Sequence, residues 1–579
     1  MRFLKQCLLP ALMVAAFSTP ALAAREFTPQ SGLWMIPSEN NGQPGRGFSL
    51  DVQGNTAFLQ VFNYEKSGAA TFHTAVGQLD AAASMTVPLL RFKDGRYLGG
   101  PTQDAVEDGS AGDVTVTFSD GLNGTIQFPG EAVQPIARFL VPEKQPFWWT
   151  QVSESPPSSR NGTREMVLTA TSANGARYAW QASLHLHDTQ DKFQLSFYPT
   201  QPYLNTSSSE PPATLECQIE QSTQTVDCVP ARTNVSGETS VDALAIQRMR
   251  FQFVGRDVVG FIQPAADRTS RLVVNGMTFS SRSSLQIKGL LEFTSKTYGV
   301  FDLMADACIL SCLTMGDSHI TILPTSGAWI IEAESQGTPG RGVFLDVQDE
   351  TVIVQTSDYL PSGDATFHMG AGKLKSSATW AGDTTATMPL FRYGGGRYFG
   401  GPPLTGREEA RAGDLTLAFS PQYGTEFTDF GTGDVGLPGE SVQRIRRLQF
   451  EPHSVSMENM LGEYLTIWDK WEGTLQREER WVRLTRVDGD VAKNDDGTVQ
   501  CKRNDSGQSG NYKMLCLWNE SADAKYDPMK WWRRAEMEIH PFLREVAHSK
   551  PVLRTRDRHG NWLGLGAVSL PGLAIPQDQ

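Results

Sequence analysis

The sequence predicts an all-β protein in which two homologous antiparallel β-barrel or sandwich repeats are each followed by a β-rich, disulfide-containing segment. Three observations lead to this prediction. The chain has 579 residues with 54 Gly and 33 Pro. Its apolar and polar residues alternate in short runs, and one long unit of sequence occurs twice. Alternation bounded by turn residues is typical of antiparallel strands that bury one face.

The alternation recurs along the whole chain. It is clearest in V-T-V-T-F at 114–118, in L-T-L-A-F at 415–419 and in Y-A-W-Q-A-S-L-H-L at 178–186. Gly, Asp or Asn bounds each run, as expected for turns between strands. The clearest candidate for a helix, at 531–538, is short.

Residues 1–23 are expected to be a signal peptide. Arg2 and Lys5 precede a short apolar run at 8–17, and Ala21-Leu22-Ala23 has the small-x-small pattern of a cleavage site. The run is shorter than the roughly 20 residues that span a bilayer, and no later stretch is long enough. The sequence therefore predicts export to the periplasm or the exterior and no membrane span.

The repeat occupies residues 24–142 and 323–452. Residues 31–80 align without gaps to 326–375, and about half of these positions are identical. The similarity continues through P-L-L-R and G-R-Y-L-G-G-P to A-G-D-V-T and P-G-E-A-V-Q in the first copy. The two copies act as a small alignment, because a residue present in both is more informative about fold or function than a residue present in only one.

The remaining segments, 143–322 and 453–579, carry all the cysteines that follow the signal peptide. The cysteines form three sequence-local pairs in a chain bound for an oxidising compartment, so we expect disulfides. Zinc is disfavoured because the C-x3-C pair has no second ligand pair at a fitting spacing. Both segments also contain an R-D step followed by glycine-spaced apolar residues, so a tandem of two two-part halves stays open. The expected pairs are Cys217–Cys228, Cys308–Cys312 and Cys501–Cys516.

The motifs of the repeat resemble a known family. G-x-W, then E…P-G-R-G-F-x-L-D-V-Q, then Y-x3-G-x2-T-F resembles an uncharacterised β-rich repeat of secreted proteobacterial proteins, which are Gram-negative. The resemblance implies export and a β fold but no chemistry. The T-W-Y of that family is replaced here by T-F-H, at 71–73 and 366–368.

A weaker similarity concerns only the opening of each unit. Gly32-Leu33-Trp34 and Gly327-Ala328-Trp329 are similar to the G-x-W that opens the first strand of lipocalin-like barrels. In that setting the tryptophan closes one end of an eight-stranded barrel, which can hold a small apolar ligand.

Two turns that occur in both copies supply the candidate binding residues. An arginine at the tip of P-G-R-G could grip a carboxylate or sugar acid, whereas the alternative pairs Arg46 with Glu39 and Arg341 with Glu334. The G-R-Y-[LF]-G-G-P turn offers an arginine and an aromatic ring for sugar or peptide contact, whereas the alternative is a turn clamped by its own tyrosine. The candidates are Arg46, Arg96, Tyr97, Arg341, Arg397 and Tyr398.

Carboxylates and histidines supply weaker hypotheses. Asp51 and Asp346 lie on predicted strands and could serve acid/base hydrolysis, although L-D-V-Q is also what the solvent-facing side of a half-buried strand shows. His185 and His187 share a strand face and form a possible metal pair, for which no third ligand can be identified.

Common catalytic and cofactor motifs are absent from the sequence. It contains no G-x-S-x-G, H-E-x-x-H or phosphate-binding P-loop motif. A net charge of −13 disfavours nucleic acid as a partner. The sequence therefore favours a non-catalytic binding or structural protein of the cell envelope or exterior, without a cofactor. Its ligand would be a glycan, a peptide or a small apolar molecule. An envelope-polymer hydrolase and a lipocalin-like carrier are the alternatives, and the oligomeric state stays open.

Overall fold

The structure is a computed structural model of the chain. It describes residues 27, 29–53, 56–80, 82–141, 163–171, 177–186, 192–199, 213–220, 225–230, 246–254, 257–264, 271–280, 324, 326–335, 339–348, 351–376, 384–419, 432–448, 462–471, 475–503, 512–518, 533–539, 547–549, 555–556 and 562–568. These residues form strands, turns and two single-turn 3-10 helices, η1 (Pro37–Glu39) and η4 (Glu332–Glu334). The predicted all-β fold is confirmed.

The first repeat is a closed antiparallel barrel of eight consecutive strands. Pairing of β1 with β8, which sets Trp34 opposite Arg138, closes the ring. The strands are β1 (Gly32–Met35), β2 (Gly47–Gln53), β3 (Thr56–Tyr64), β4 (Ala70–Gln78), β5 (Ser84–Lys93), β6 (Val106–Phe118), β7 (Asn123–Gln127) and β8 (Gln134–Arg138).

The second repeat has the same strand order with one short addition. Pairing of β20 with β22 joins the two ends of the run β20-β19-β18-β17-β25-β24-β23-β22, so these strands also form a closed ring. The strands are β17 (Gly327–Ile331), β18 (Gly342–Gln348), β19 (Thr351–Tyr359), β20 (Ala365–Lys373), β21 (Lys375–Ser376), β22 (Thr384–Gly394), β23 (Arg407–Phe419), β24 (Thr432–Gly436) and β25 (Gln443–Arg447).

The segment between the repeats also forms a closed barrel of eight strands, the middle barrel. Its strands are β9 (Thr163–Thr171), β10 (Arg177–Leu186), β11 (Lys192–Pro199), β12 (Ala213–Glu220), β13 (Thr225–Pro230), β14 (Ile246–Val254), β15 (Asp257–Pro264) and β16 (Leu272–Ser280).

The C-terminal segment forms a nine-stranded sheet. The candidate helix at 531–538 is wrong, because Arg533–Ile539 is strand β31 and pairs along its whole length with β30. The strands are β26 (Gly462–Trp471), β27 (Leu475–Asp488), β28 (Val491–Asn494), β29 (Val499–Arg503), β30 (Tyr512–Trp518), β31, β32 (Ala547–Ser549), β33 (Thr555–Arg556) and β34 (Trp562–Val568).

The middle barrel and the C-terminal sheet share a feature of strand order. A disulfide joins Cys217 and Cys228, which lie opposite each other on the fourth and fifth strands of the middle barrel. Cys501 is disulfide-bonded and faces Cys516 on the fourth and fifth strands of the C-terminal sheet. Cys308 and Cys312 lie outside the described residues. The shared position supports the hypothesis that the chain is a tandem of two two-part halves.

Each repeat barrel is filled by alternate residues of its strands. In the first repeat, Trp34, Phe118 and Phe128 belong to one buried apolar cluster inside the ring. Trp329 and Phe419 occupy the equivalent cluster of the second repeat. The Trp34 indole N–H donates to the Gln30 carbonyl at 2.9 Å, which satisfies the ring nitrogen of this otherwise apolar side chain.

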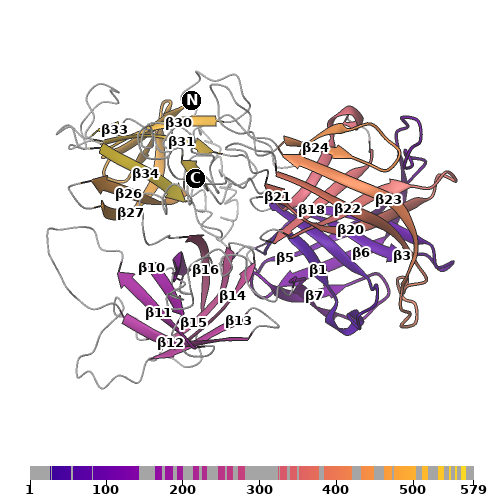
Figure 1. Ribbon diagram of the computed structural model, residues 1–579, viewed down its shortest axis with the longest axis horizontal. Coiled ribbons are helices and arrows are strands. Elements are labelled where there is room, and N and C mark those ends of the chain that lie inside the picture. Colours follow the sequence, from indigo (N-terminus) through magenta and orange to yellow (C-terminus); the bar gives the residue numbers. More distant parts are fainter. Residues whose placement is uncertain are drawn as a thin grey trace, which may run out of the picture.

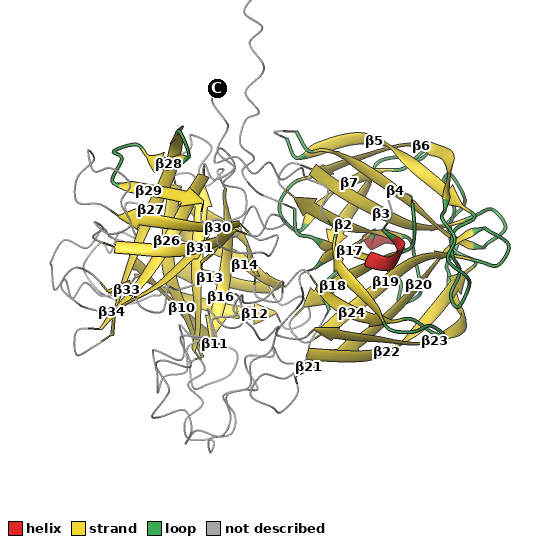
Figure 2. Cartoon of the chain, turned by 90° about the horizontal axis from the view of Figure 1, so that it is seen from above, coloured by secondary structure: helices red, strands yellow, loops and turns green. Residues whose placement is uncertain are grey.

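The two repeat barrels lie side by side through the outer faces of β2–β4 and β18–β20 (Figures 1 and 2). Every residue of β2 and of β19 is buried, on both faces of the strand. The interpretation of L-D-V-Q as a solvent-facing pattern is therefore wrong. Asp51 and Asp346 are completely buried, because the polar outer face of each barrel is covered by the other barrel.

Candidate functional site

The residues that the two repeats share converge where the barrels meet. Residues 95–101, the first crossing loop, reach the end of the second-repeat barrel, and residues 396–402, the second crossing loop, reach the end of the first-repeat barrel. Leu98 packs against the interior cluster of the second-repeat barrel. Phe399 does the same in the first-repeat barrel. Each barrel is thus closed at one end by a loop of the other repeat.

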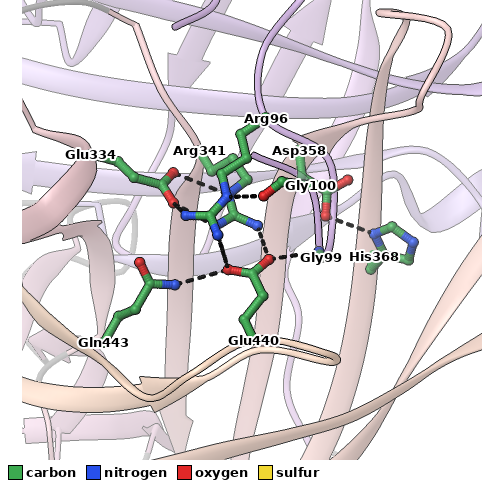
Figure 3. A network of polar contacts seen from close by, with 9 residues as sticks. All are labelled: Arg96, Gly99, Gly100, Glu334, Arg341, Asp358, His368, Glu440 and Gln443. Carbon is green, nitrogen blue, oxygen red and sulfur yellow. Dashed lines mark hydrogen bonds and ion pairs between the residues drawn. The ribbon is translucent and has the colours of Figure 1, made fainter. Parts of the chain in front are cut away.

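Two arginines and two glutamates hold the first crossing loop on the second-repeat barrel (Figure 3). Arg341 binds Glu334 at 3.0 Å from Nε to Oε2 and Glu440 at 2.6 Å from Nη1 to Oε1. Arg96 reaches across from the other repeat to the same two carboxylates, at 2.8 Å and 3.0 Å. The Gly99 N–H also donates to Glu440 Oε1, at 2.9 Å.

The end of the first-repeat barrel repeats this arrangement. Arg46 binds Glu39 at 2.6 Å and Glu131 at 2.7 Å. Arg397 of the second crossing loop binds the same carboxylates, at 3.1 Å and 3.3 Å. The N–H of Gly400 donates to Glu131 Oε1 at 2.9 Å.

The charges in these clusters reinforce one another. Burial by itself lowers the pKa of Arg46 and of Arg341, but the hydrogen bonds that each arginine donates to two glutamates raise its pKa above the ordinary value. Burial alone would raise the pKa of Glu131 and of Glu440, but the arginines and the loop N–H groups lower it. All these groups are therefore charged at neutral pH, and each carboxylate is fully engaged as an acceptor.

A second set of reciprocal ion pairs lies on the buried sheet faces. Arg138 donates to Asp346 at 2.7 Å from Nη1 and 2.5 Å from Nη2. Arg447 forms the equivalent pair with Asp51, at 2.7 Å from Nη2 to Oδ1. Each aspartate also accepts a backbone N–H from the first strand of the other repeat, at 3.0 Å.

The glycine of G-x-W, present in both copies, makes room for these arginines. Gly32 has φ +134°, and a Cβ on it would lie 2.0 Å from Nη2 of Arg138. Gly327, with φ +131°, would place a Cβ 1.9 Å from Nη2 of Arg447. Only glycine tolerates both the backbone conformation and the close approach.

The tyrosines of the crossing loops pack on their own turns. A Cβ on Gly100 would lie 2.8 Å from the Tyr97 ring, and a Cβ on Gly401 would lie 2.9 Å from the Tyr398 ring. Arg96 Nε donates to the Gly100 carbonyl at 2.9 Å, and Arg397 Nε donates to the Gly401 carbonyl at 3.0 Å. Each loop is therefore shaped internally, as the alternative of a tyrosine-clamped turn proposed.

The structure places the six candidate binding residues in two groups at the contact between the repeats, one group at each barrel end. The alternative pairing of Arg46 with Glu39 and of Arg341 with Glu334 is confirmed. Both arginines are buried, whereas Arg96, Tyr97, Arg397 and Tyr398 are half-buried. A contact of these residues with an external ligand stays a prediction.

The metal hypothesis gains no support from the described residues. Among them, no group of three or more His, Cys, Asp or Glu side chains could hold a metal ion. His185 lies on β10 opposite Gln194, and His187 lies outside the described residues. None of the helices among the described residues has the length and apolar character that a membrane span requires.

The two matched histidines lie inside the barrels, beneath the crossing loops, and differ in their partners. His368 Nδ1 lies 3.1 Å from Asp358 Oδ2. In the first repeat Asn63 replaces this aspartate, and neither His73 Nδ1 nor Asn63 Oδ1 has a hydrogen-bond partner among the described residues. Burial, with a smaller contribution from Arg91, lowers the pKa of His73 to about 4. His73 is therefore neutral at pH 7, and its ring centre lies 5.0 Å from that of Phe399.

Sequence reasoning did not select the acceptors and arginines that complete these clusters. Glu131 and Glu440 occur in the repeated P-G-E motif, and Arg138 and Arg447 end the last matched segment of each copy. Their identity in both copies was the available signal. What the sequence did not indicate is that each of them also binds a residue of the other repeat.

Comparisons with known proteins add little. No protein family matches the chain, and no curated protein matches it. Among solved structures, the chain is similar to a double mutant of the vaccine antigen Transferrin Binding Protein B from Haemophilus parasuis Hp5. The match covers 79% of this chain and 82% of that chain, with 8% identity and a TM-score of 0.15. A TM-score this low carries no argument about fold or function.

Proposed function

We propose that the chain is an exported, non-catalytic binding or structural protein of the cell envelope or exterior, built on a double barrel. The observation that carries this proposal is that the charged residues shared by both repeats hold the two barrels together. Arg46 binds Glu131 and Arg341 binds Glu440, and each glutamate also binds a crossing loop, so what the duplication preserves is a scaffold.

The proposal of a non-catalytic role rests on the state of the carboxylates. A general acid or base needs a proton-accepting atom that faces the substrate. Asp51 and Asp346 instead face arginines inside the contact between the barrels, and Glu131 and Glu440 each bind two arginines. An envelope-polymer hydrolase would have to use other residues.

A carrier of small apolar ligands has less support than a scaffold. A carrier needs an open apolar interior, whereas large side chains such as Trp34, Phe118 and Phe128 pack together within the first-repeat barrel. The second-repeat barrel is filled in the same way around Trp329. The disulfide in the middle barrel favours an oxidising compartment, in agreement with export.

Binding and turnover can be measured on the same preparation. The mature protein, residues 24–579, would be tested against glycan arrays, peptidoglycan and whole envelope fractions, and the same polymers would be monitored for cleavage. We expect saturable retention on one class of material without release of products. Polymer cleavage would establish the hydrolase instead, and an apolar molecule extracted from the purified protein would establish the carrier.

A further inference from the structure

Each barrel end behaves as a receptor for the crossing loop that closes it. The loop enters with an arginine, an apolar side chain and a glycine N–H, and each of these meets a matching group. In the first-repeat barrel the arginine is Arg397, the apolar side chain is Phe399 and the N–H belongs to Gly400. These three contacts fall within four consecutive residues.

The receptor supplies charge and an apolar floor. Glu39 and Glu131 bind Arg397, and Glu131 also accepts the Gly400 N–H. Phe128 lies 5.0 Å from Phe399 between ring centres. Arg46 donates hydrogen bonds to both glutamates and so keeps them in place. Its guanidinium carbon lies 5.9 Å from the centre of the Phe399 ring, as in a cation–π contact.

The second-repeat barrel binds its loop by the same rule. Arg96 meets Glu334 and Glu440, the Gly99 N–H meets Glu440, and Leu98 packs on the barrel interior. The apolar position differs between the copies, as Phe399 and Leu98, whereas the arginine and the glycines do not. The sequence pattern that both barrel ends bind is therefore an arginine, an aromatic residue, an apolar residue and two glycines.

The ligand is also shaped before it binds. In both loops the arginine Nε donates to the carbonyl of the second glycine, and the tyrosine ring covers that glycine. These contacts are internal to the loop and use no residue of the receptor. A loop that holds its own bound shape loses less entropy on binding than an unstructured one.

We propose that each barrel end is a loop-binding site that recognises Gly-Arg-aromatic-apolar-Gly-Gly, occupied here by the protein's own crossing loop and able to bind a protein loop of the same chemistry from another molecule. The negative pair of glutamates selects the arginine. The apolar floor selects the third side chain of the motif. The site is thus a protein–protein recognition site in addition to a structural contact.

The test supplies the loop as a free peptide. In the full mature chain, Arg397→Ala with Phe399→Ser removes both anchors of the second crossing loop and leaves the first-repeat barrel end open. The probe is acetyl-Gly-Arg-Tyr-Phe-Gly-Gly-Pro-amide, labelled for fluorescence anisotropy. We expect the double variant to bind it at least tenfold more tightly than the wild type, whose site is filled.

Two matched controls locate the binding. Adding Glu131→Gln to the double variant should abolish binding, whereas adding Glu440→Gln, at the other barrel end, should leave it unchanged. A peptide with Ala and Ser in place of Arg and Phe should not bind. Failure of a folded double variant to bind the peptide, or binding that does not depend on Glu131, would overturn the proposal.

The reciprocal end and the unaltered protein provide independent measurements. Arg96→Ala with Leu98→Ser opens the second-repeat barrel end, and we expect it to bind the Gly-Arg-Tyr-Leu-Gly-Gly-Pro peptide. In the wild type, excess peptide should accelerate amide hydrogen exchange of residues 398–401 by displacing the resident loop. Unchanged exchange at saturating peptide would contradict the proposal even if neither double variant folds.

Discussion

At the scale of single residues, the fold depends on charges that are buried but paired. Asp346 and Arg138 come from different repeats and are almost completely enclosed. Removing one partner of such a pair leaves the other charge without compensation in a poorly solvated place, which costs far more than the pair itself contributes. This asymmetry makes the aspartates sensitive reporters of the contact between the barrels.

The first prediction concerns Asp346. Asp346→Asn leaves the Arg138 guanidinium buried without its counter-ion, and we expect a loss of about 3–5 kcal/mol in the free energy of unfolding. Urea unfolding followed by tryptophan fluorescence measures it. Asp414→Asn is the control, because the Asp414–Arg411 pair is half-exposed and contributes little. Equal effects of the two substitutions would contradict the burial argument.

The second prediction concerns the neutral histidine in the first-repeat barrel. The pKa of folded His73 is about 4, below the ordinary value of 6.5, so the unfolded chain binds a proton that the folded chain excludes. Stability from this group is present above pH 6.5 and is lost as the pH falls toward 4, at up to about 1.4 kcal/mol per pH unit.

The comparison of His73→Gln with the wild type isolates this contribution. Between pH 6.5 and pH 4 we expect the wild type to lose more stability than the variant, in urea unfolding at matched salt. Both proteins share the glutamate clusters, whose stabilisation also falls in acid because their carboxylate pKa values are lowered. Parallel stability curves for the two proteins would show that His73 does not titrate as the structure implies.

At the scale of elements, the crossing loops are the parts whose role the sequence least revealed. The G-R-Y turn was predicted to be a loop, which is correct. The two interpretations of this turn, external contact or a self-clamped turn, both involve residues of one copy only. In the structure the loop clamps itself and also closes the other barrel, because Gly95 and Gly396 let it lie against a tyrosine of the opposite repeat.

The third prediction tests that close approach. A Cβ on Gly95 would lie 2.0 Å from the Tyr359 ring, and on Gly396 it would lie 2.1 Å from the Tyr64 ring. Gly95→Ala or Gly396→Ala should each destabilise the protein by roughly 1–3 kcal/mol through overpacking. Gly109→Ala is the control, because its methyl group would meet open space and only the positive φ of residue 109 would be unfavourable. We expect Gly109→Ala to lower the stability less than the other two substitutions. Thermal unfolding of the three variants measures the difference.

The fourth prediction concerns the C-terminal sheet. The strand register sets Cys501 opposite Cys516, matching the place of Cys217–Cys228 in the middle barrel. Peptide mapping under non-reducing conditions should recover a Cys501–Cys516 cross-link. Cys501→Ser with Cys516→Ser should lower stability by roughly 2–4 kcal/mol. A map that links Cys501 to another cysteine would remove the support for two equivalent halves.

At the scale of the whole molecule, the duplication produces a pair of barrels joined like a two-fold dimer within one chain. The buried ion pairs and the loop contacts occur twice, once in each direction: Arg138 with Asp346 and Arg447 with Asp51, and one crossing loop at each barrel end. A reciprocal contact of this kind is the intramolecular counterpart of an isologous interface.

The fifth prediction follows from this reciprocity. A protease site would be inserted between residues 281 and 323. Cleavage there cuts the chain into two fragments, each of which contains one repeat. We expect the two fragments to elute together in gel filtration, since the contact between the barrels does not need the connection. In the Asp51→Asn/Asp346→Asn background they should separate after cleavage. Separation of the fragments in the unsubstituted protein would contradict the prediction.

For the G-R-Y turns the sequence left open both external contact and a tyrosine clamp, but the all-β class and the extent of the two repeats could be predicted from it. These follow from period-two alternation, glycine positions and residue identity between copies, all of which are local along the chain. The roles of Asp51, Asp346, Glu131 and the crossing loops are visible only in the folded chain, because each of them binds residues of the other repeat. An outer strand face has the same polar pattern whether water or a second barrel covers it.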